Sequence, residues 1–303
     1  MERWAGRVAV VTGASSGIGE AIAVQLVKKG MVVVGVARRL EVLQKLSETL
    51  QSEPGKLYPL TADLTSEEDI LSAFKWIESN LGRVDVMVNN AGIALKAGLV
   101  DGRTSYWRLI LDTNVLALSI CTREAVRVMR QRGVDDGHVI HINSMYGHYA
   151  STVADNEMYA ASKHAVTALT EGLRRELVQL GSGIRVTSIS PGFVDTPLLT
   201  APERELEAGF VQSNPLLLPE DIAGAALYAL GTPPRVQVGL SASHPSFLFF
   251  SSHVLFTSFL LPRKLFIKIQ LVTHRLICVK KGPKVFSVIN ITCTTFLMCN
   301  FFF

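Results

Sequence analysis

Short apolar runs alternate with longer amphipathic stretches along most of this 303-residue chain. The apolar runs are rich in Val and Ile, and each is followed by turn residues and then by apolar positions at helical spacing. Strands that are hydrophobic on both faces and alternate with helices form a parallel sheet between two helical layers. The pattern therefore predicts an α/β fold, a single Rossmann-type doubly wound parallel sheet with helices on both faces.

Residue ranges follow from the same pattern. Strands are predicted over 8–11, 32–37, 56–61, 84–89, 138–143 and 184–190, and a last one starts at 235–238. Helices are predicted after the glycine-rich turn near Gly17 and over 40–50, 66–81, 105–132, 156–180 and 219–230. Residues 200–215 contain acids and two prolines, which favours a loop or short helix over the site. Pro59 cannot donate to a ladder, so we expect strand 56–61 at the edge of the sheet.

The composition changes near Gly239. All 26 acidic residues lie at or before Asp221, whereas 11 of the 14 Phe lie after Gly239. We therefore expect the doubly wound domain over residues 1–239, with an incomplete last strand, and an atypical hydrophobic tail over 240–303. Residues 285–303 carry no charge and are long enough to span a bilayer, which favours a membrane anchor. The alternative is translated non-coding sequence, from a retained intron or a wrong exon assignment.

Charge and cysteine content narrow the class of protein. Seven of the 30 Lys and Arg lie after Gly239, so the net charge of +4 comes from the tail and nucleic-acid binding is not supported. Cys121 is the one cysteine before Gly239, which indicates a reducing compartment. Only six residues precede the first apolar run, Arg7 to Thr12, too few for a cleaved signal peptide. We expect a cytoplasmic protein that is membrane-associated only if the tail is genuine.

A glycine-rich segment, TGASSGIG from Thr12 to Gly19, lies between the first predicted strand and the first helix. Gly13 would permit a tight turn, and Gly17 and Gly19 would let the backbone approach a pyrophosphate at the helix N-terminus. A glycine trio alone is weak, but its place between strand and helix makes a dinucleotide site the better interpretation.

Two arginines follow the second predicted strand, where the adenosine ribose of a dinucleotide is bound. An acid there would bind the ribose hydroxyls of NAD, whereas Arg38 and Arg39 suit a phosphate and favour NADP. The alternative for both is a solvated helix start. Asp63 follows the third strand and would either contact the adenine or cap the next helix.

A second group of residues carries proton chemistry. Ser144 ends the strand 138–143, and Tyr159 and Lys163 lie one turn apart on one face of the helix 156–180. A phenol titrates near pH 10, and a nearby ammonium lowers its pKa, so Tyr159 would serve as an acid/base near neutral pH. The Ser144 hydroxyl would orient a carbonyl and bond the oxygen as charge develops. Asn114 lies within a helical stretch, where Asn is unfavourable unless its amide is used.

These motifs together resemble the short-chain dehydrogenase/reductase family over residues 5–239. The resemblance rests on TGASSGIG at Thr12, NNAG at Asn89, YAASK at Tyr159, the Pro191-Gly192 turn, and the single residues Asn114, Ser144 and Thr196. The segments ALSICTRE, VDDGHVIHINSM and AVTALTEGLRREL are similar to the branch that holds farnesol dehydrogenases and related keto-steroid and carbonyl reductases.

The resemblance implies a role for each matching residue. Tyr159 is the acid/base, Lys163 lowers its pKa and bonds the nicotinamide ribose, Ser144 positions the carbonyl, and Asn114 holds a water that relays protons. NADP(H) is the implied cofactor and no metal is expected. Cofactor contacts are implied for Gly13, Ser15, Ser16, Gly17, Ile18, Gly19, Arg38, Arg39, Asp63, Leu64, Asn90, Ala91, Gly92, Tyr159, Lys163, Pro191, Gly192, Val194 and Thr196. A homo-oligomer, dimer or tetramer, is also implied, with helices 105–132 and 156–180 as candidate interfaces.

Loop residues around the predicted site are mostly apolar or aromatic, which favours a small lipophilic alcohol or carbonyl. They are Ile93, Leu95, Met145, Tyr146, Tyr149, Phe193, Leu198 and Leu199. Farnesol or a related isoprenoid alcohol is the substrate that the resemblance favours, with a keto-steroid or general carbonyl substrate as the alternative. An alternative of another class is a non-catalytic NADP-binding scaffold, which would not need Asn114, Ser144, Tyr159 and Lys163.

Overall fold

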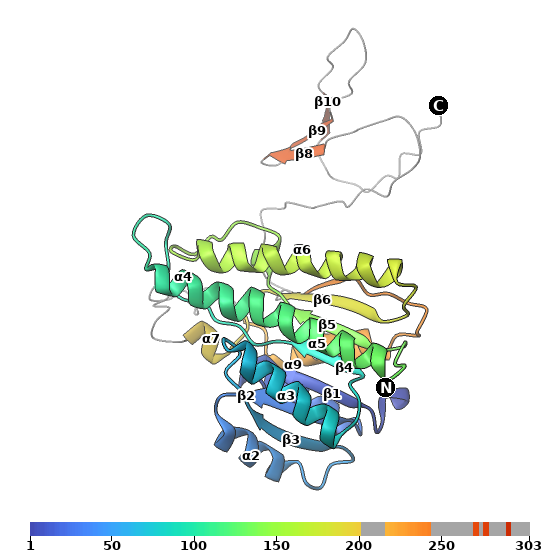
Figure 1. Ribbon diagram of the computed structural model, residues 1–303. Coiled ribbons are helices and arrows are strands. Elements are labelled where there is room, and N and C mark those ends of the chain that lie inside the picture. The colour runs from blue at the N-terminus through green and yellow to red at the C-terminus, as the bar shows by residue number, and fades with distance from the viewer. Residues whose placement is uncertain (201–215, 244–268, 273–274, 279–288, 292–303) are drawn as a thin grey trace, which may run out of the picture. The chain divides into compact units, whose positions relative to one another are not determined.

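A computed structural model describes residues 1–200, 216–243, 269–272, 275–278 and 289–291, and the chain divides into the compact units Met1–Ser246 and Phe247–Phe303. The first unit holds a seven-stranded parallel sheet in the order β3-β2-β1-β4-β5-β6-β7 (Figure 1). Its strands are β1 Val8–Thr12, β2 Val32–Ala37, β3 Lys56–Thr61, β4 Val86–Asn89, β5 His138–Ile142, β6 Arg185–Pro191 and β7 Leu240–Ser243. The order reverses between β1 and β4, where doubly wound sheets bind their ligands.

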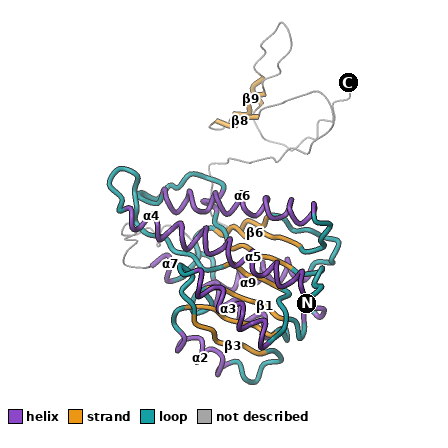
Figure 2. Tube along the Cα trace, viewed as in Figure 1, coloured by secondary structure: helices purple, strands orange, loops and turns teal. Residues whose placement is uncertain are grey.

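Helices cover both faces of this sheet (Figure 2). The main ones are α1 Gly17–Lys28, α2 Leu40–Thr49, α3 Glu67–Asn80, α4 Thr104–Leu111, α5 Ala117–Gln131, α6 Glu157–Gln179 and α9 Pro219–Gly231, with the short α7 Pro197–Thr200 and the 3-10 turns η1 Glu2–Trp4 and η3 Met145–Gly147. Successive strand residues point to opposite faces, so Ala9 and Val11 pack with α1 and α9 while Val8 and Val10 pack with α3 and α5. The predicted doubly wound fold is confirmed.

The predicted position of strand 56–61 at the edge of the sheet is also confirmed. Strand β3 pairs only with β2 within the described sheet, and it contains Pro59.

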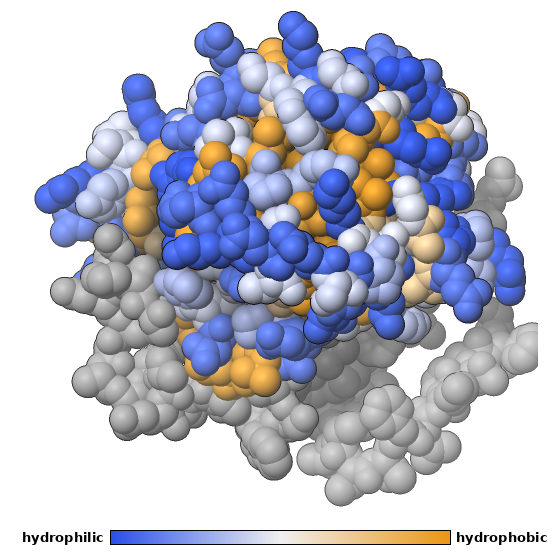
Figure 3. All heavy atoms as spheres, turned by 90° about the horizontal axis from the view of Figure 1, so that it is seen from below, coloured by the Kyte–Doolittle hydropathy of each residue, from blue (hydrophilic) through white to orange (hydrophobic). Residues whose placement is uncertain are grey.

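Polar residues cover most of the coloured part of the face seen from below in Figure 3, with apolar residues among them, as expected for a surface in water.

The predicted bounds of one helix and one strand are wrong. The single helix expected over 105–132 is interrupted by a π-helical turn, η2 Asp112–Leu116, which contains the buried Asn114. The last strand begins at Leu240, beyond the predicted boundary at Gly239, and not at Arg235. The cause lies in Gln237, whose side-chain amide hydrogen-bonds the main chain of Val186 and so takes the place of a strand residue there.

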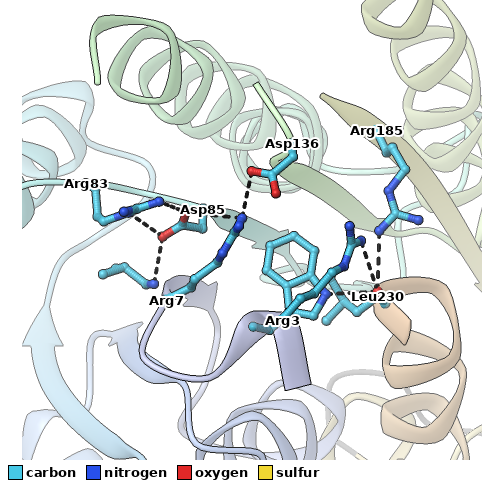
Figure 4. Close-up of polar contacts among 9 residues, drawn as sticks. Arg3, Arg7, Arg83, Asp85, Asp136, Arg185 and Leu230 are labelled. Atoms are coloured by element: carbon cyan, nitrogen blue, oxygen red, sulfur yellow. Dashed lines mark hydrogen bonds and ion pairs between the residues drawn. The ribbon is translucent and has the colours of Figure 1, made fainter. Parts of the chain in front are cut away.

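A polar cluster closes the amino ends of the strands (Figure 4). The carbonyl of Leu230, at the end of α9, accepts hydrogen bonds from Arg3, Trp4 and Arg185. Cations and N–H donors suit the negative end of a helix. Ion pairs beside it join Arg7, Arg83, Asp85 and Asp136. The cluster fixes the start of the chain to α9, at the end of the sheet opposite to the strands' carboxyl ends.

The described residues of the second unit form a three-stranded antiparallel sheet in the order β10-β9-β8. The strands are β8 Ile269–Val272, β9 Arg275–Cys278 and β10 Ile289–Ile291. The membrane segment predicted over 285–303 lies outside the described residues except for β10, and the loop predicted over 200–215 lies outside them except for Thr200. Among the residues that the structure describes, no helix has the length and apolar character needed to cross a membrane.

Candidate active site

A cavity of about 600 Å³ lies at the carboxyl ends of the strands. Its lining includes the residue that directly follows each of the first six strands. These residues are Gly13, Arg38, Ala62, Asn90, Asn143 and Gly192. Six chain segments, far apart in sequence, therefore meet at one edge of the sheet, as the sequence pattern predicts.

The glycine-rich turn packs closely on the segment after β4. Gly13 and Gly17 have φ values of +67° and +58°, a conformation that favours glycine. A Cβ on Gly19 would come within 2.3 Å of the Asn90 amide nitrogen and 2.4 Å of the Gly13 carbonyl oxygen. Gly19 thus does not line the cavity, but it lets α1 begin against the turn. Ser15, Ser16, Gly17 and Ile18 all face the cavity at the helix N-terminus.

Thr12, which sequence analysis did not single out, joins the two cofactor motifs. Its hydroxyl accepts hydrogen bonds from the main-chain N–H groups of Asn90, over 3.0 Å, and Ala91, over 3.1 Å. The Asn90 amide in turn donates to the Thr12 carbonyl over 2.9 Å. The signal that could have identified Thr12 is the adjacency of β1 and β4 at the switch point. These bonds hold Asn90, Ala91 and Gly92 against the cavity.

The two arginines after β2 have different surroundings. Arg39 donates from Nη2 to the Ser15 carbonyl over 3.1 Å and to Ser15 Oγ over 3.0 Å. Arg38 is exposed and lines the cavity, and its guanidinium makes no hydrogen bond or ion pair with any residue that the structure describes. Arg39 therefore stabilises the glycine-rich turn through Ser15, whereas the N–H groups of the Arg38 guanidinium are available to bind an anion.

Asp63 and Leu64, which follow β3, also line the cavity. Asp63 Oδ1 accepts from the backbone N–H of Thr65 over 3.0 Å and from its hydroxyl over 2.8 Å. These bonds lower the pKa of the Asp63 carboxyl, the backbone bond contributing most. Ser66, not Asp63, is the N-cap of α3, so the helix-cap alternative for Asp63 is wrong and the carboxylate orders the turn before the cap.

Tyr159 and Lys163 lie on the first turns of α6 and are both buried at the cavity wall. Lys163 Nζ lies 5.7 Å from the centre of the Tyr159 ring and donates to the Ile142 carbonyl over 2.9 Å. Burial lowers the pKa of Lys163 to about 8, because the ammonium has left water. A positive charge is thus held close to the Tyr159 phenol by the end of β5.

Ser144 follows β5 in extended backbone and lines the cavity. Its hydroxyl oxygen accepts from the Tyr146 N–H over 3.2 Å, which caps η3. A hydroxyl that accepts one bond still has its own hydrogen to donate. The cap fixes the place of Ser144 Oγ without using that hydrogen.

Asn114 is buried and does not line the cavity. Both hydrogens of its amide are used, one by the Ile93 carbonyl over 2.9 Å and one by Ser162 Oγ over 3.0 Å. Its Oδ1 accepts from the Ile93 N–H over 2.8 Å. The predicted water relay at Asn114 stays a prediction. Ser162 is a further residue that sequence analysis missed, although it stands next to Lys163 in the motif.

One end of the cavity is apolar. Tyr146 and Phe193 meet edge to face, with ring centroids 6.2 Å apart, and Tyr146 Oη hydrogen-bonds Thr152 Oγ1 over 3.1 Å. Tyr149 packs on this cluster but does not line the cavity. The remaining predicted loop residues do line it: Ile93, Leu95, Met145, Leu198 and Leu199.

The end of β6 and the segment that follows it also line the cavity. Pro191, Gly192, Val194 and Thr196 line it, and a Cβ on Gly17 would lie 3.0 Å from Thr196 Cγ2. This contact places the segment against the glycine-rich turn. The whole arrangement defines a Rossmann-type α/β domain with its site at the switch point of the sheet.

The short chain dehydrogenase family model matches residues 7–207, and the chain therefore belongs to this family of oxidoreductases. It is 52% identical over 240 residues to a farnesol dehydrogenase of Aedes aegypti, covering 78% of this chain and 95% of the relative. It is 50% identical over 244 residues to dehydrogenase/reductase SDR family member 11 of Bos taurus, covering 79% and 96%. The resemblance predicted from the motifs is confirmed.

Solved structures agree with this assignment. An alcohol dehydrogenase from Thermococcus sibiricus, complexed with 5-hydroxy-NADP, superposes with a TM-score of 0.70 at 25% identity, covering 80% of this chain and 97% of that one. A serine dehydrogenase complexed with NADP+ superposes with a TM-score of 0.72 at 27% identity, covering 83% and 100%. Nicotinamide cofactors therefore occupy this fold in its relatives.

Proposed function

We propose that this protein is an NADP(H)-dependent oxidoreductase that interconverts a lipophilic alcohol and its carbonyl compound, with Tyr159 as the acid/base. The observation that carries the proposal is that Tyr159, Lys163 and Ser144 line the same cavity as the glycine-rich turn. A site built only to bind a nucleotide would not need a buried ammonium beside a phenol.

Proton transfer is the task of the protein's own residues. When bound, the nicotinamide cofactor supplies or accepts the hydride. In the direction of reduction, Tyr159 Oη gives its proton to the carbonyl oxygen, and in oxidation it takes the proton of the alcohol. Lys163, held by the Ile142 carbonyl, stabilises the phenolate that reduction leaves. Ser144 donates its hydroxyl hydrogen to the same substrate oxygen and fixes its direction.

The residues present fit an NADP cofactor. N–H groups at the start of α1 suit a pyrophosphate, and Arg38 suits the 2′-phosphate because its donors are not used within the described part of the chain. Arg39 would act on the same phosphate through Ser15, which it positions. The relatives complexed with NADP+ and 5-hydroxy-NADP support this choice.

A lipophilic substrate is supported by the apolar end of the cavity, where Met145, Tyr146, Phe193 and Leu199 are buried together. Similarity to a farnesol dehydrogenase favours farnesol or another isoprenoid alcohol. A keto-steroid or a general carbonyl compound would fit the same wall and is the second candidate. We further propose a homo-oligomer in the cytoplasm, with α4, α5 and α6 as the candidate interface.

The test uses the purified full chain with NADPH, NADH and a panel containing farnesal, a keto-steroid and a small diketone. We expect NADPH oxidation with the highest kcat/KM for a lipophilic carbonyl, and the reverse reaction with its alcohol. A preference for short polar carbonyls would contradict the apolar assignment. Saturable NADPH binding without turnover of any compound would favour the scaffold alternative.

A further inference from the structure

His141, the residue before the last in β5, is the centre of a buried polar network on the α5 and α6 face of the sheet. It is 1% exposed, and in the strand register it stands beside Asn89 of β4. Its imidazole bonds Thr122 of α5 through Nε2, over 3.2 Å, and Thr170 of α6 through Nδ1, over 2.8 Å. Nothing in the proposed chemistry uses this imidazole.

The hydrogens of the network have one consistent arrangement. Thr170 donates its hydroxyl hydrogen to the Val166 carbonyl over 2.7 Å, so its oxygen accepts from His141 Nδ1–H. His141 Nε2 is then an acceptor and takes the hydroxyl hydrogen of Thr122. The Asn89 amide donates to Thr122 Oγ1 over 2.9 Å, which completes the chain of donors. His141 is thus neutral, with its hydrogen on Nδ1.

Electrostatics agrees with a neutral ring. Burial, and next the charge of Lys163, lower the pKa of His141 to about 3. A second positive charge in this space would also oppose the ammonium of Lys163, which is itself buried.

The three elements that His141 joins are those that carry the proposed catalytic groups. Strand β5 ends at Ile142, whose carbonyl holds Lys163 Nζ, and Ser144 follows two residues later. Helix α6 carries Tyr159 and Lys163, and Thr170 lies two turns after Lys163. Helix α5 continues directly from the π-helical turn of Asn114.

We propose that His141 is a positioning residue: with its hydrogen on Nδ1, it orders the hydroxyls of Thr122 and Thr170 and so fixes α6 and α5 on β5 in the arrangement that brings Tyr159, Lys163 and Ser144 together. The catalytic consequence rests on the proposed function. The hydrogen-bond arrangement does not rest on it.

The chain offers a matched control in the same strand. His138 is also fully buried, but it faces the α1 and α9 side and hydrogen-bonds Thr187 over 2.8 Å. His141→Leu and His138→Leu both remove a buried imidazole and its bonds, so both should lower the thermal stability. Only His141→Leu should act on the catalytic helix. His141→Gln keeps one donor and one acceptor, and should recover most of any loss.

The kcat and KM values of the folded variants test whether His141 affects catalysis. A misplacement of catalytic groups by an ångström costs up to about 100-fold in rate, so we expect His141→Leu to lower kcat about 10- to 100-fold with little change in KM. His138→Leu should keep the wild-type kcat, and Thr170→Val, a milder change, should fall between them. Equal kcat values for wild type, His141→Leu and Thr170→Val would overturn the inference.

Two spectroscopic readouts do not depend on turnover. The ring ¹⁵N shifts of His141 should show a neutral imidazole with Nδ1–H at pH 6, and the Nε2–H form or a cation would overturn the arrangement. The ¹³Cε shift of Lys163 should move in His141→Leu and Thr170→Val but not in His138→Leu, and an unmoved shift in both would overturn the positioning. If wild type reduces none of the panel, the proposed function fails and these readouts alone decide the role of His141.

Discussion

Asn114 donates a hydrogen bond to Ser162 Oγ over 3.0 Å, and this bond joins the π-helical turn to the helix of the proposed acid/base. Ser162 passes its own hydrogen to the Tyr159 carbonyl over 2.6 Å. Short π-helical insertions are common at functional sites, because they move one side chain out of the regular register. Here the amide of Asn114 in the insertion bonds both Ile93 and Ser162.

Asn114→Asp tests these hydrogen bonds, because aspartate has almost the same shape as asparagine. A carboxylate cannot donate, so the Ile93 carbonyl and Ser162 Oγ would each lose a donor in a buried place. An unsatisfied buried group costs about 1–3 kcal/mol, and we expect the unfolding free energy to fall by at least that amount. Chemical denaturation measures it, and an unchanged midpoint would show that the amide hydrogens are not needed.

The two arginines after β2 should respond differently to substitution. Arg38→Asp replaces the group that we propose binds the phosphate by one that repels it, and hydrogen bonds to charged groups are worth about 1.5–3 kcal/mol. The NADPH-to-NADH ratio of kcat/KM should therefore fall by about 10- to 100-fold. Arg39→Ala, which releases Ser15, should weaken binding of both cofactors and change the ratio much less. An unchanged ratio in Arg38→Asp would remove Arg38 from the phosphate site.

Gly19→Ala should distort the glycine-rich turn. Its Cβ would come within 2.4 Å of the Gly13 carbonyl oxygen, which belongs to backbone and cannot move aside cheaply. We expect a lower melting temperature and weaker NADPH binding, measured by scanning calorimetry and by fluorescence titration. Gly224→Ala is the control, because Gly224 lies on the exposed face of α9 and nothing lies within 4 Å of the added methyl, so it should stabilise the fold by about 1 kcal/mol. Equal effects of both changes would mean that α1 does not need its close approach.

Burial of Lys163 predicts a specific dependence of stability on pH. Its pKa is about 8 in the folded state and 10.5 as the ordinary value, so between these values the unfolded chain binds more protons. The free energy of unfolding of wild type, relative to Lys163→Met, should therefore rise as the pH goes from about 8 to about 10.5. Below pH 8 the charge is buried in the folded state and the difference should be constant. A difference that is flat throughout, or that falls, would show that Lys163 keeps its ordinary pKa.

The sequence allows the fold to be predicted where local pattern and tertiary environment agree. Strands β2 and β3 lie over the predicted residues, and Pro59 correctly marks the edge. The π-helical turn could not be predicted, because one inserted residue scarcely changes the apolar spacing of a long helix. The last strand was predicted to start too early because residues 235–238 have the more strand-like composition, whereas the side chain of Gln237 occupies their place in the ladder.

The sequence predicted which motif residues gather at the candidate site, but it did not predict the contacts that support them. Motif residues gather at strand ends, and topology alone brings these ends together. The supporting contacts depend on side-chain directions across neighbouring elements. Ser162, Thr12 and the two different roles of Arg38 and Arg39 are therefore visible only in the structure.

Proton transfer by Tyr159 is the central claim, and single-turnover oxidation of NADPH by the full chain tests it most directly. With NADPH bound to saturation and a lipophilic carbonyl in excess, Tyr159→Phe should lose at least about 100-fold in rate, the scale of a general-acid contribution. Tyr228→Phe, on the exposed face of α9, is the matched control and should keep the wild-type rate. A Tyr159→Phe protein that oxidises NADPH as fast as wild type would contradict the account.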